Sequence, residues 1–473
     1  MKTYHLAVDL GATSGRTILA SFDGEKVDME ELTRFKYPML PLAGHLFWNL
    51  PYLYAEIINA LKTAGEKLSA AGNTLSSIGI DTWGCDVAYF YADGTIAGLP
   101  YCYRDPHTAG AVEEFAKKMP KREVYEKTGI QFMDFNTLFQ LDTLRRNGAD
   151  VLDSCDKILW MPDALAYMLT GNAVTEYTVA STAEMLNPAT GDLDTDILKA
   201  LGLDRSKFGP MVQPGAVIGS ITSQVQEATG LGAVPVVAVA GHDTASAVIG
   251  VPTPDENYAY LSCGTWSLLG IESPHAIIND RSYELNFTNE GGIDGTTRFL
   301  KNICGLWIFE RVRTEMGLQD ADISALAASC LDSDCNSIIN PDDPSFANPK
   351  SMVEAINEYC RVHGEAVPVT TADYVRVVYR SLAHRVGEML ALLKEMATAP
   401  IKRLHVIGGG SRNVHLMDML AQETGLPVVA GPAECTALGN VLVQLRASGR
   451  AESLAEMRRV AINSTETKTF TPK

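Results

Sequence analysis

The sequence predicts an α/β protein made of two halves with a similar design. Each half holds two short apolar runs joined by a turn of glycine and hydroxyl residues, at 6–20 and again at 258–271. Elsewhere, apolar runs of strand length alternate with helical patterns, which is typical of α/β folds. The segment 251–257 contains two prolines and two acidic residues and is the best linker candidate, so we expect domains at 1–250 and 251–473.

Length, charge and cysteine usage narrow the class of protein. A chain of 473 residues is too long for one hydrophobic core. Its net charge of −18 argues against a nucleic acid or an anionic membrane as partner, because polyanions bind basic surfaces, but it leaves an anionic small ligand possible. No apolar stretch has the length of a membrane span, and the first residues lack a signal-peptide pattern. The nine cysteines include no C-x-x-C pair, which favours free thiols in a reducing cytoplasm.

The first hairpin candidate has its turn within the stretch 9–16, between two apolar runs. Gly11 and Gly15 permit tight turns and let a bulky anion approach the main chain. The polar residues are a carboxylate that could hold a metal ion or its water, two hydroxyl donors, and a forked cation suited to phosphate oxygens: Asp9, Thr13, Ser14 and Arg16. A plain hairpin turn explains this one stretch equally well.

The rest of the first half reads as strands and helices in sequence. We expect a strand that continues the meander, a helix with an apolar face, a buried strand, a strand that opens a hairpin, a mostly helical region closed by Gly171, a strand that begins near Pro235, and a short apolar helix: 26–38, 53–71, 77–81, 87–90, 109–171, 234–240 and 244–249.

The second half begins like the first and ends in an α/β pattern. The expected elements are two strands around the turn 262–265, two helices, a strand that enters Gly408–Gly410, a further strand and a final helix: 258–261, 266–271, 303–317, 373–396, 404–407, 426–430 and from about 434. The helix 373–396 carries a continuous apolar stripe, which predicts a buried core helix.

Asp243 follows one apolar run and precedes another. Aspartate is a preferred N-cap residue, and position alone favours that structural role. The alternative is a general base, a carboxylate at a strand end that faces a cleft. His242 alone is more often structural, but beside Asp243 it could orient a hydroxylated ligand.

Three other places carry candidate site residues. Trp83 and Gly84 end an apolar strand and could wall a sugar pocket, or Trp83 could be an ordinary core residue. Gly408–Gly410, between a strand and a helix, suits close approach of a nucleotide to the backbone. Lys301, Asn302 and Glu310 are polar positions around an expected helix start.

Taken together, these stretches resemble the FGGY carbohydrate kinases, and within that family those acting on L-rhamnulose. The resemblance covers almost the whole chain. In the first half it is carried by VDLGATSGR (8–16), SIGIDTWGCD (77–86), GIQFMDFNTLFQL (129–141), KILWMPD (157–163) and GHDTASAV (241–248). In the second half it is carried by YLSCGTWSL (260–268), TNEGG (288–292), KNICGLW (301–307), VIGGGSRN (406–413) and AGPAECTALGN (430–440).

This resemblance implies a fold and assigns roles to residues. It implies two ribonuclease-H-like domains of the actin-like ATPase type around a central cleft. Asp243 would be the catalytic base and Asp9 would help to place Mg²⁺, the implied cofactor. ATP would be bound by Ala12, Thr13, Ser14, Gly15, Arg16, Thr265, Glu310, Gly408, Gly409 and Gly410. The sugar would be bound by Gly84, His242, Asp243, Thr244 and Asn302. The family often has Gln at the position of Glu310.

The implied activity is ATP-dependent phosphorylation of L-rhamnulose at O1 to L-rhamnulose 1-phosphate, in the cytoplasmic catabolism of L-rhamnose. The implied partners are the sugar and ATP, without nucleic acid or membrane, in a monomer or a small homo-oligomer. A kinase of another ketose or polyol, such as L-fuculose or a signalling diol, is the nearest alternative. A nucleotide-gated regulator without catalysis is the alternative from another class, but it would be expected to lack the base.

Overall fold

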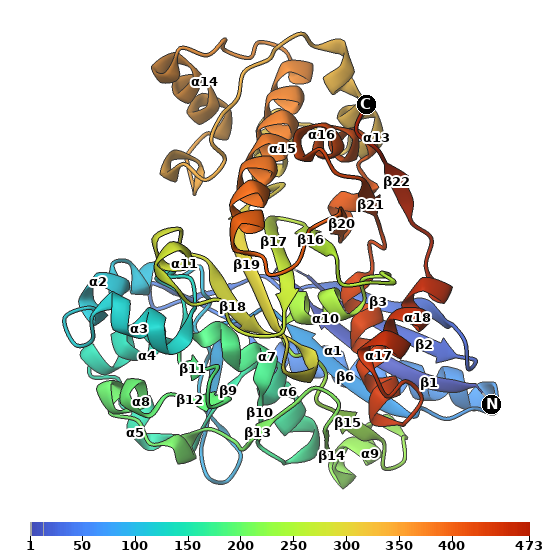
Figure 1. Cartoon of the computed structure of the whole chain (residues 1–473). Helices are drawn as coiled ribbons and strands as arrows, with labels where there is room; N and C mark the ends of the chain where they lie inside the picture. Colours follow the sequence, from blue (N-terminus) through green and yellow to red (C-terminus); the bar gives the residue numbers. More distant parts are fainter. Residues whose placement is uncertain (1, 13) are drawn as a thin grey trace. The chain divides into compact units, whose positions relative to one another are not determined.

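The computed structural model describes residues 2–12 and 14–473, and Figure 1 shows the arrangement of its helices and strands. The contacts divide the chain into two compact units. Unit 1 comprises Met1–Pro254, Glu272–Phe299 and Cys435–Ser464, and unit 2 comprises Asp255–Ile271, Leu300–Glu434 and Thr465–Lys473. Unit 1 therefore includes two segments from beyond the linker, and the linear division at residue 250 stays a prediction.

Unit 1 is built on a sheet with the strand order β14-β15-β6-β1-β2-β3. Strands β1 and β2 are antiparallel, whereas β1 and β6 are parallel. The expected hairpin, meander and buried strand are thus confirmed. The strands are β14 (Val217–Ser220), β15 (Pro235–Val237), β6 (Ser77–Thr82), β1 (Thr3–Leu10), β2 (Ser14–Phe22) and β3 (Val27–Lys36).

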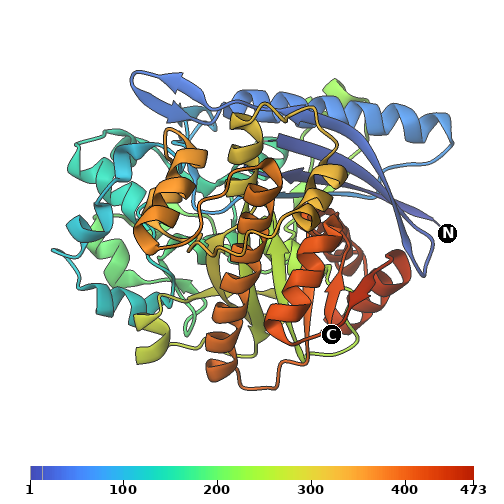
Figure 2. The ribbon, with the colours of Figure 1, turned by 90° about the horizontal axis from the view of Figure 1, so that it is seen from above.

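Helices cover both faces of this sheet because the side chains of β1 alternate between two buried layers. Leu6 and Val8 pack in the same core as helix α1 (Leu50–Ala70), which Figure 2 shows in blue beside the strands. Ala7 packs on the other side, in a core that includes residues of α10 (Asp243–Ile249) and α17 (Cys435–Ala447). The sequence missed helix α18 (Leu454–Ser464), which follows α17 in the same unit.

The remainder of unit 1 is mostly helical, as expected for 109–171, with small sheets between the helices. Besides the two hydrophobic cores on either side of the main sheet, unit 1 has a third core, which lies among these helices. The helices are α2 (Ala111–Phe115), α3 (Lys121–Thr128), α4 (Thr137–Arg146), α5 (Val151–Ser154), α6 (Met161–Thr170), α7 (Tyr177–Ala180), α8 (Thr195–Leu201), α9 (Ser223–Thr229) and α11 (Asp280–Glu284). The short strands are β4 (Leu40–Leu42), β5 (His45–Phe47), β7 (Val87–Phe90), β8 (Ile96–Gly98), β9 (Lys157–Trp160), β10 (Thr175–Glu176), β11 (Leu186–Asn187), β12 (Asp192–Leu193), β13 (Met211–Val212) and β18 (Thr288–Gly291).

The second large sheet has the strand order β18-β19-β17-β16-β20-β21-β22. Most of its strands belong to unit 2, whereas β18 and the first residues of β19 belong to unit 1. The second predicted hairpin is confirmed, because β16 and β17 pair in an antiparallel register from Tyr260 to Cys263. The strands are β16 (Tyr258–Cys263), β17 (Trp266–Ser273), β19 (Thr297–Cys304), β20 (Arg403–Ile407), β21 (Val428–Ala430) and β22 (Lys468–Phe470). The sequence missed β22.

The long helix of unit 2 is α15 (Thr371–Met396), and its predicted stripe, from Val375 to Leu393, is buried. Figure 1 shows α16 (Val414–Thr424) beside it. The other helices of this unit are α12 (Trp307–Glu315), α13 (Ile323–Ala328) and α14 (Met352–His363). The helix expected from residue 303 is wrong at its start, because Ile303 and Cys304 belong to strand β19. Among the described residues, no helix combines the length and the apolar character needed to cross a bilayer.

Candidate active site

Asp243 is the first residue of helix α10, and its expected role as N-cap is wrong. The N-cap is His242, whose side chain makes no capping hydrogen bond. The hydroxyl of Thr244 donates to Oδ1 of Asp243 at 3.1 Å, and 32% of the Asp243 side chain is exposed. The carboxylate is therefore held at one oxygen and is still accessible, so it can come within hydrogen-bond reach of a substrate proton.

The backbone before Asp243 is fixed by buried groups of unit 1. The amide of Gly241 donates to Oε2 of Glu176 at 2.9 Å, and the Gly241 carbonyl accepts from Thr82 at 2.9 Å. The same Glu176 carboxylate accepts from two amides at the start of α7. Burial raises the pKa of Glu176, although these donors oppose that shift. This carboxylate thus ties α7 to the loop that carries Asp243.

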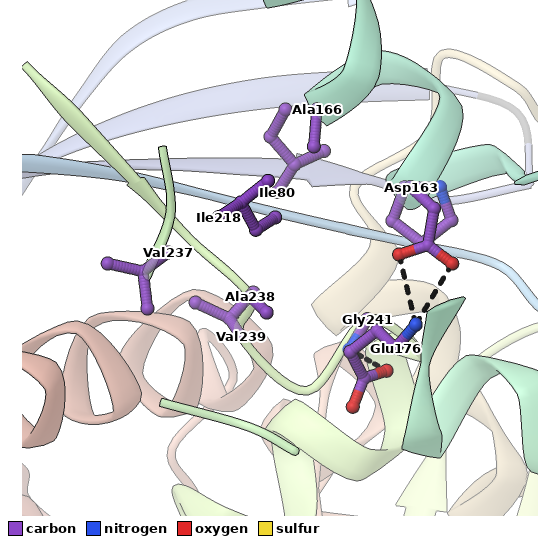
Figure 3. Close-up of a pocket in the computed structure, with 10 residues that line it drawn as sticks. Ile80, Asp163, Ala166, Glu176, Ile218, Val237, Ala238, Val239 and Gly241 are labelled. Carbon is purple, nitrogen blue, oxygen red and sulfur yellow. Dashed lines mark hydrogen bonds between the residues drawn. The ribbon is translucent and has the colours of Figure 1, made fainter. Parts of the chain in front are cut away.

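Behind Gly241 lies a small cavity whose walls include Asp163 and Glu176 (Figure 3). Both oxygens of Asp163 accept from the backbone amide of Glu176, at 3.1 and 3.2 Å. Burial, followed by the charge of Glu176, raises the pKa of Asp163 well above its ordinary value. The Asp163 carboxylate therefore holds the backbone of Glu176, whose own carboxylate accepts from the Gly241 amide.

The imidazole of His242 lies between Asp243 and a buried ion pair of Glu290 and Arg298. Its Nε2 is 3.4 Å from Oδ1 of Asp243, and its Nδ1 is 3.2 Å from Oε2 of Glu290. Nη1 of Arg298 lies 3.0 Å from the same Glu290 oxygen. Sequence reasoning missed both partners. Glu290 stands inside the TNEGG motif, but no local pattern marks it as a partner of His242.

A second group of carboxylates lies at the ends of β1 and β6. Asp9 and Asp81 are paired in register across these parallel strands. Nε and Nη2 of Arg16 both donate to Oδ2 of Asp9, at 2.9 and 2.7 Å. Burial and then the charge of Asp9 raise the pKa of Asp81 well above its ordinary value, and the charge of Asp243 acts in the same direction. The carboxylates of Asp9 and Asp243, from two other segments of unit 1, thus both act on the pKa of Asp81.

The first hairpin turn is closed by its own backbone and by an aromatic residue. The amide of Gly11 donates to the carbonyl of Ser14 at 3.1 Å, and the Tyr37 hydroxyl donates to the Gly11 carbonyl. A Cβ on Gly15 would lie 2.6 Å from a side-chain atom of Leu10, so close packing also favours glycine here. Thr13 lies outside the described residues, and Ala12 is half-buried in the turn.

Trp83 is a core residue: it is 5% exposed, and its ring centroid lies 4.2 Å from that of Trp48. Both indole N–H groups donate to Asp86, at 2.9 and 2.5 Å. Burial raises the pKa of Asp86 to about 6, although these hydrogen bonds oppose it. Gly84 packs on Thr182, whose hydroxyl would be 2.8 Å from an added Cβ. The structure thus favours the core role of Trp83.

The residues around Asp9 fit a magnesium ion bound largely through water and phosphate. Within the described residues, no three His, Cys, Asp or Glu side chains are grouped to hold a metal ion. Oδ1 of Asp81 is buried without a hydrogen-bond partner in that part of the chain. Mg²⁺ commonly takes one or two carboxylates and completes its shell with waters and substrate phosphates. The carboxylate oxygens of Asp9 and Asp81, which do not surround an ion completely, are compatible with this coordination.

In unit 2, the second hairpin turn is held by backbone contacts. The Gly264 amide donates to the Trp266 carbonyl at 3.0 Å, and the Gly264 carbonyl accepts from Leu306 at 2.8 Å. The Thr265 carbonyl accepts from Trp307, the first residue of α12, at 3.3 Å. A Cβ on Gly305 would lie 2.5 Å from the Gly264 carbonyl oxygen. The turn therefore rests directly on the start of α12.

The loop Gly408–Gly410 packs on the same hairpin of unit 2. Gly408 has a φ of 82°, which favours glycine, and a Cβ on Gly410 would lie 2.3 Å from Sγ of Cys263. Asn413 caps α16 through a hydrogen bond from the Leu416 amide at 3.1 Å. The structure thus brings the Thr265 turn and the three glycines together.

Two further predicted residues of unit 2 have different surroundings. Glu310 lies on α12 and forms an ion pair with Arg313 at 2.7 Å. Asn302 and Lys301 lie on β19, half-buried, rather than at a helix start. Burial lowers the pKa of Lys301 to about 8, although the charge of Asp342 opposes this shift.

Comparison with protein families identifies both halves of the chain. Residues 4–250 match the N-terminal domain of the FGGY family of carbohydrate kinases, and residues 259–448 match its C-terminal domain. The chain belongs to the FGGY family of carbohydrate kinases. The predicted family membership is thereby confirmed.

The relatives of this FGGY kinase include three proteins named rhamnulokinase. That of Bacteroides thetaiotaomicron is 50% identical and aligns with 100% of this chain and 96% of its own length. That of Mannheimia succiniciproducens is 42% identical over 98% of this chain and 94% of its own. That of Bacillus subtilis is 37% identical over 99% and 95%, respectively.

Solved structures show the same fold at low sequence identity. Gluconate kinase from Lactobacillus acidophilus has a TM-score of 0.83 and 16% identity, covering 100% of this chain and 94% of its own. Plasmodium falciparum glycerol kinase with ADP has a TM-score of 0.81 and 17% identity, with the same coverage. The fold is therefore the two-domain α/β fold of FGGY kinases, with ribonuclease-H-like domains of the actin-like ATPase type, as predicted.

Proposed function

We propose that this protein is an ATP-dependent rhamnulokinase that transfers the γ-phosphoryl group of ATP to O1 of L-rhamnulose. The observation that carries the proposal is full-length similarity, at 37–50% identity, to relatives named rhamnulokinase. The product is L-rhamnulose 1-phosphate, an intermediate of L-rhamnose catabolism. An open carboxylate at Asp243 supports catalysis over a purely regulatory role.

Asp243 is the proposed general base. It accepts the proton of the O1 hydroxyl while O1 bonds to the γ-phosphorus and the bond from that phosphorus to the ADP oxygen breaks. The sugar is proposed to contact Gly84, His242, Asp243 and Thr244 of unit 1 and Asn302 of unit 2. The tie from Glu176 to Gly241 supports this assignment, because a base must be held in place to act.

The nucleotide is proposed to bind through both hairpin turns and the glycine loop. Its proposed contacts are Ala12, Thr13, Ser14, Gly15 and Arg16 in unit 1, and Thr265, Glu310, Gly408, Gly409 and Gly410 in unit 2. Backbone amides and one cation suit this task, because phosphoryl transfer depends on alignment and charge stabilisation. Among these residues, Glu310 also forms an ion pair with Arg313.

Mg²⁺ is the proposed cofactor, with Asp9 as the residue that helps to hold it, directly or through water. Bound there, the ion would neutralise charge on the phosphate oxygens. Arg16 has two proposed tasks, because it is the partner of Asp9 as well as a candidate phosphate ligand. We also propose a cytoplasmic location, for which nine free cysteines are suited, and a monomer or a small homo-oligomer.

A substrate panel tests the function. The release of ADP from ATP is coupled to NADH oxidation with L-rhamnulose, L-fuculose, L-ribulose, D-xylulose and glycerol as acceptors. We expect the highest kcat/KM for L-rhamnulose, and phosphorus NMR should show a phosphate ester at C1. Another sugar at the top of the ranking would replace the substrate assignment, and no acceptor above the ATP-only rate would contradict the kinase proposal.

A further inference from the structure

Behind the proposed base lies a buried chain of charged groups that ends at the His242 imidazole. Glu290 belongs to β18 and Arg298 to the first residues of β19, so one hairpin of unit 1 supplies both. Arg298 is 1% exposed and Glu290 is 5% exposed. The guanidinium is also tied to its own hairpin, since Nε donates to the carbonyl of Gly291 at 2.9 Å.

The contacts of the ring restrict where its protons lie. Nδ1 faces Oε2 of Glu290 at 3.2 Å and Nη2 of Arg298 at 3.3 Å. A neutral ring with its proton on Nε2 accepts from Arg298 at Nδ1, and an imidazolium donates to Glu290 there. A ring with its only proton on Nδ1 would instead turn a lone pair toward the Asp243 carboxylate. Both favourable states therefore place a proton on Nε2, toward Asp243.

The two oxygens of Asp243 differ in their surroundings. Oδ1 accepts from the Thr244 hydroxyl at 3.1 Å and lies 3.4 Å from Nε2 of His242. Within the described part of the chain, no hydrogen bond or ion pair involves Oδ2. Because Oδ1 already accepts the Thr244 hydroxyl and has the His242 ring nitrogen beside it, the chemistry of this site favours the less engaged Oδ2 as the basic atom.

We propose that Glu290 and Arg298 are positioning residues that act through His242. They hold the ring so that Nε2–H points at Oδ1 of Asp243, which leaves Oδ2 to receive the proton of the substrate hydroxyl. This inference deepens the proposed kinase function and rests on it. The ion pair is internally neutral, so it can orient the ring without adding net charge beside the base.

Glu290→Gln tests the proposal, because it keeps the size of the side chain and removes its charge. We expect kcat for the sugar to fall roughly 10- to 100-fold, the size of loss known for removing the hydrogen-bond partner that orients a metal-binding histidine. KM for ATP should stay within about twofold, since the substitution leaves the nucleotide contacts unchanged. Glu290→Asp, which keeps the charge, should recover part of the lost kcat.

A double-mutant cycle separates positioning from general damage. If Glu290 acts through His242, the variant His242→Gln/Glu290→Gln should be no slower than His242→Gln alone. Fully additive losses would overturn the proposal. Glu290→Gln leaves Arg298 buried without its charged partner, which can itself cause misfolding. The double variant Glu290→Gln/Arg298→Gln removes both charges together, and its loss of kcat should match that of Glu290→Gln.

The matched control is Glu272→Gln. It breaks another glutamate–arginine pair of unit 1, between the half-buried Glu272 and the buried Arg458, which lies outside this chain of contacts. We expect near-normal kcat from this variant, and an equal loss in both variants would overturn the proposal. Thermal unfolding of each variant reports on its fold.

A spectroscopic readout remains informative if the proposed substrate is wrong. Long-range proton–nitrogen NMR of ¹⁵N-labelled protein reports which ring nitrogens carry protons, and His242→Gln assigns the signals. We expect a protonated Nε2 in the unmodified protein, and a change in this signal in Glu290→Gln but not in Glu272→Gln. An unprotonated Nε2 would overturn the positioning proposal, whereas absence of sugar turnover would overturn only the proposed function.

Discussion

The two glycine hairpins have similar sequences but are held in different ways. In unit 1, the hairpin of β1 and β2 is braced by side chains: Arg16 binds Asp9, and the Tyr37 hydroxyl bonds to the turn. In unit 2, the turn of β16 and β17 is braced by backbone, because Gly264 bonds to the start of α12 and Gly305 packs directly against it.

This difference divides the proposed chemistry between the two units. The Asp9–Arg16 pair, Asp81 and Asp243 all lie in unit 1, where their charges influence one another. In unit 2, the second hairpin and the glycine loop are packed closely against their neighbours, and the polar groups that they offer are main-chain groups. We infer that unit 1 supplies charge for catalysis and metal binding, whereas unit 2 supplies shape and backbone donors for the nucleotide.

The largest effect is expected from removing the charge of Asp243 in unit 1. Asp243→Asn keeps the size of the side chain but removes the proposed base, so kcat should fall by roughly 10²- to 10⁴-fold. ATP binding, measured by calorimetry, should change little, because the proposed nucleotide contacts do not include Asp243. Near-normal turnover in this variant would remove Asp243 as the base.

Asp280→Asn is the matched control for that substitution. Asp280 is likewise the first residue of a helix in unit 1, α11, but its side chain is 81% exposed. A loss of turnover here would mean that removal of a helix-terminal charge, and not of a base, explains the result for Asp243.

A smaller effect is expected from the backbone in unit 2. In Gly305→Ala, the new Cβ would lie 2.5, 2.6 and 2.7 Å from backbone atoms of Gly264, Trp266 and Thr265, which cannot rotate away. Overpacking of this kind destabilises by about 1–3 kcal/mol. We expect KM for ATP to rise by roughly tenfold, a change of about 1.4 kcal/mol, with little change in KM for the sugar.

Gly232→Ala is the control for added volume, since a Cβ there meets no atom within 4 Å. It should leave both KM values unchanged. If Gly305→Ala alters KM for the sugar and for ATP equally, the division of roles between the units is wrong.

Local patterns predicted the elements whose signal lies in their own residues. The buried stripe of α15 and both hairpins follow from periodicity and turn residues alone. Strand β19 was partly mistaken for a helix, because a short apolar run around Ile303 fits either period. The return of Cys435–Ser464 to unit 1 depends on contacts with distant segments, which no local pattern contains.

The candidate site shows the same limit. The sequence singled out Asp243, but aspartate is so common as an N-cap that its actual place, one residue into the helix, needed the structure. Glu290 and Arg298 follow His242 by 48 and 56 positions along the chain and meet it only through the fold. The assignment of Gly15 to anion approach also overlooked the packing of Leu10.

The smallest effect concerns a titratable group on the same strand as Asp9. Nδ1 of His5 contacts the Ser77 hydroxyl at 2.7 Å, and burial, followed by the charge of Arg450, lowers the pKa of His5 to about 4 from 6.5. Between these values the unfolded chain binds a proton that the folded chain does not. The contribution of His5 to the free energy of unfolding is therefore complete above pH 6.5. It is lost as the pH falls, by at most about 1.4 kcal/mol per pH unit.

His5→Gln should flatten that dependence. We expect the midpoint of urea unfolding to fall less between pH 6.5 and pH 5 in this variant than in the unmodified protein, because the substituted side chain does not titrate. His363→Gln, which replaces an exposed histidine of unit 2, should retain the full slope. Parallel pH profiles for all three proteins would show that the fold of unit 1 does not keep His5 neutral and that a charge on this strand costs no stability.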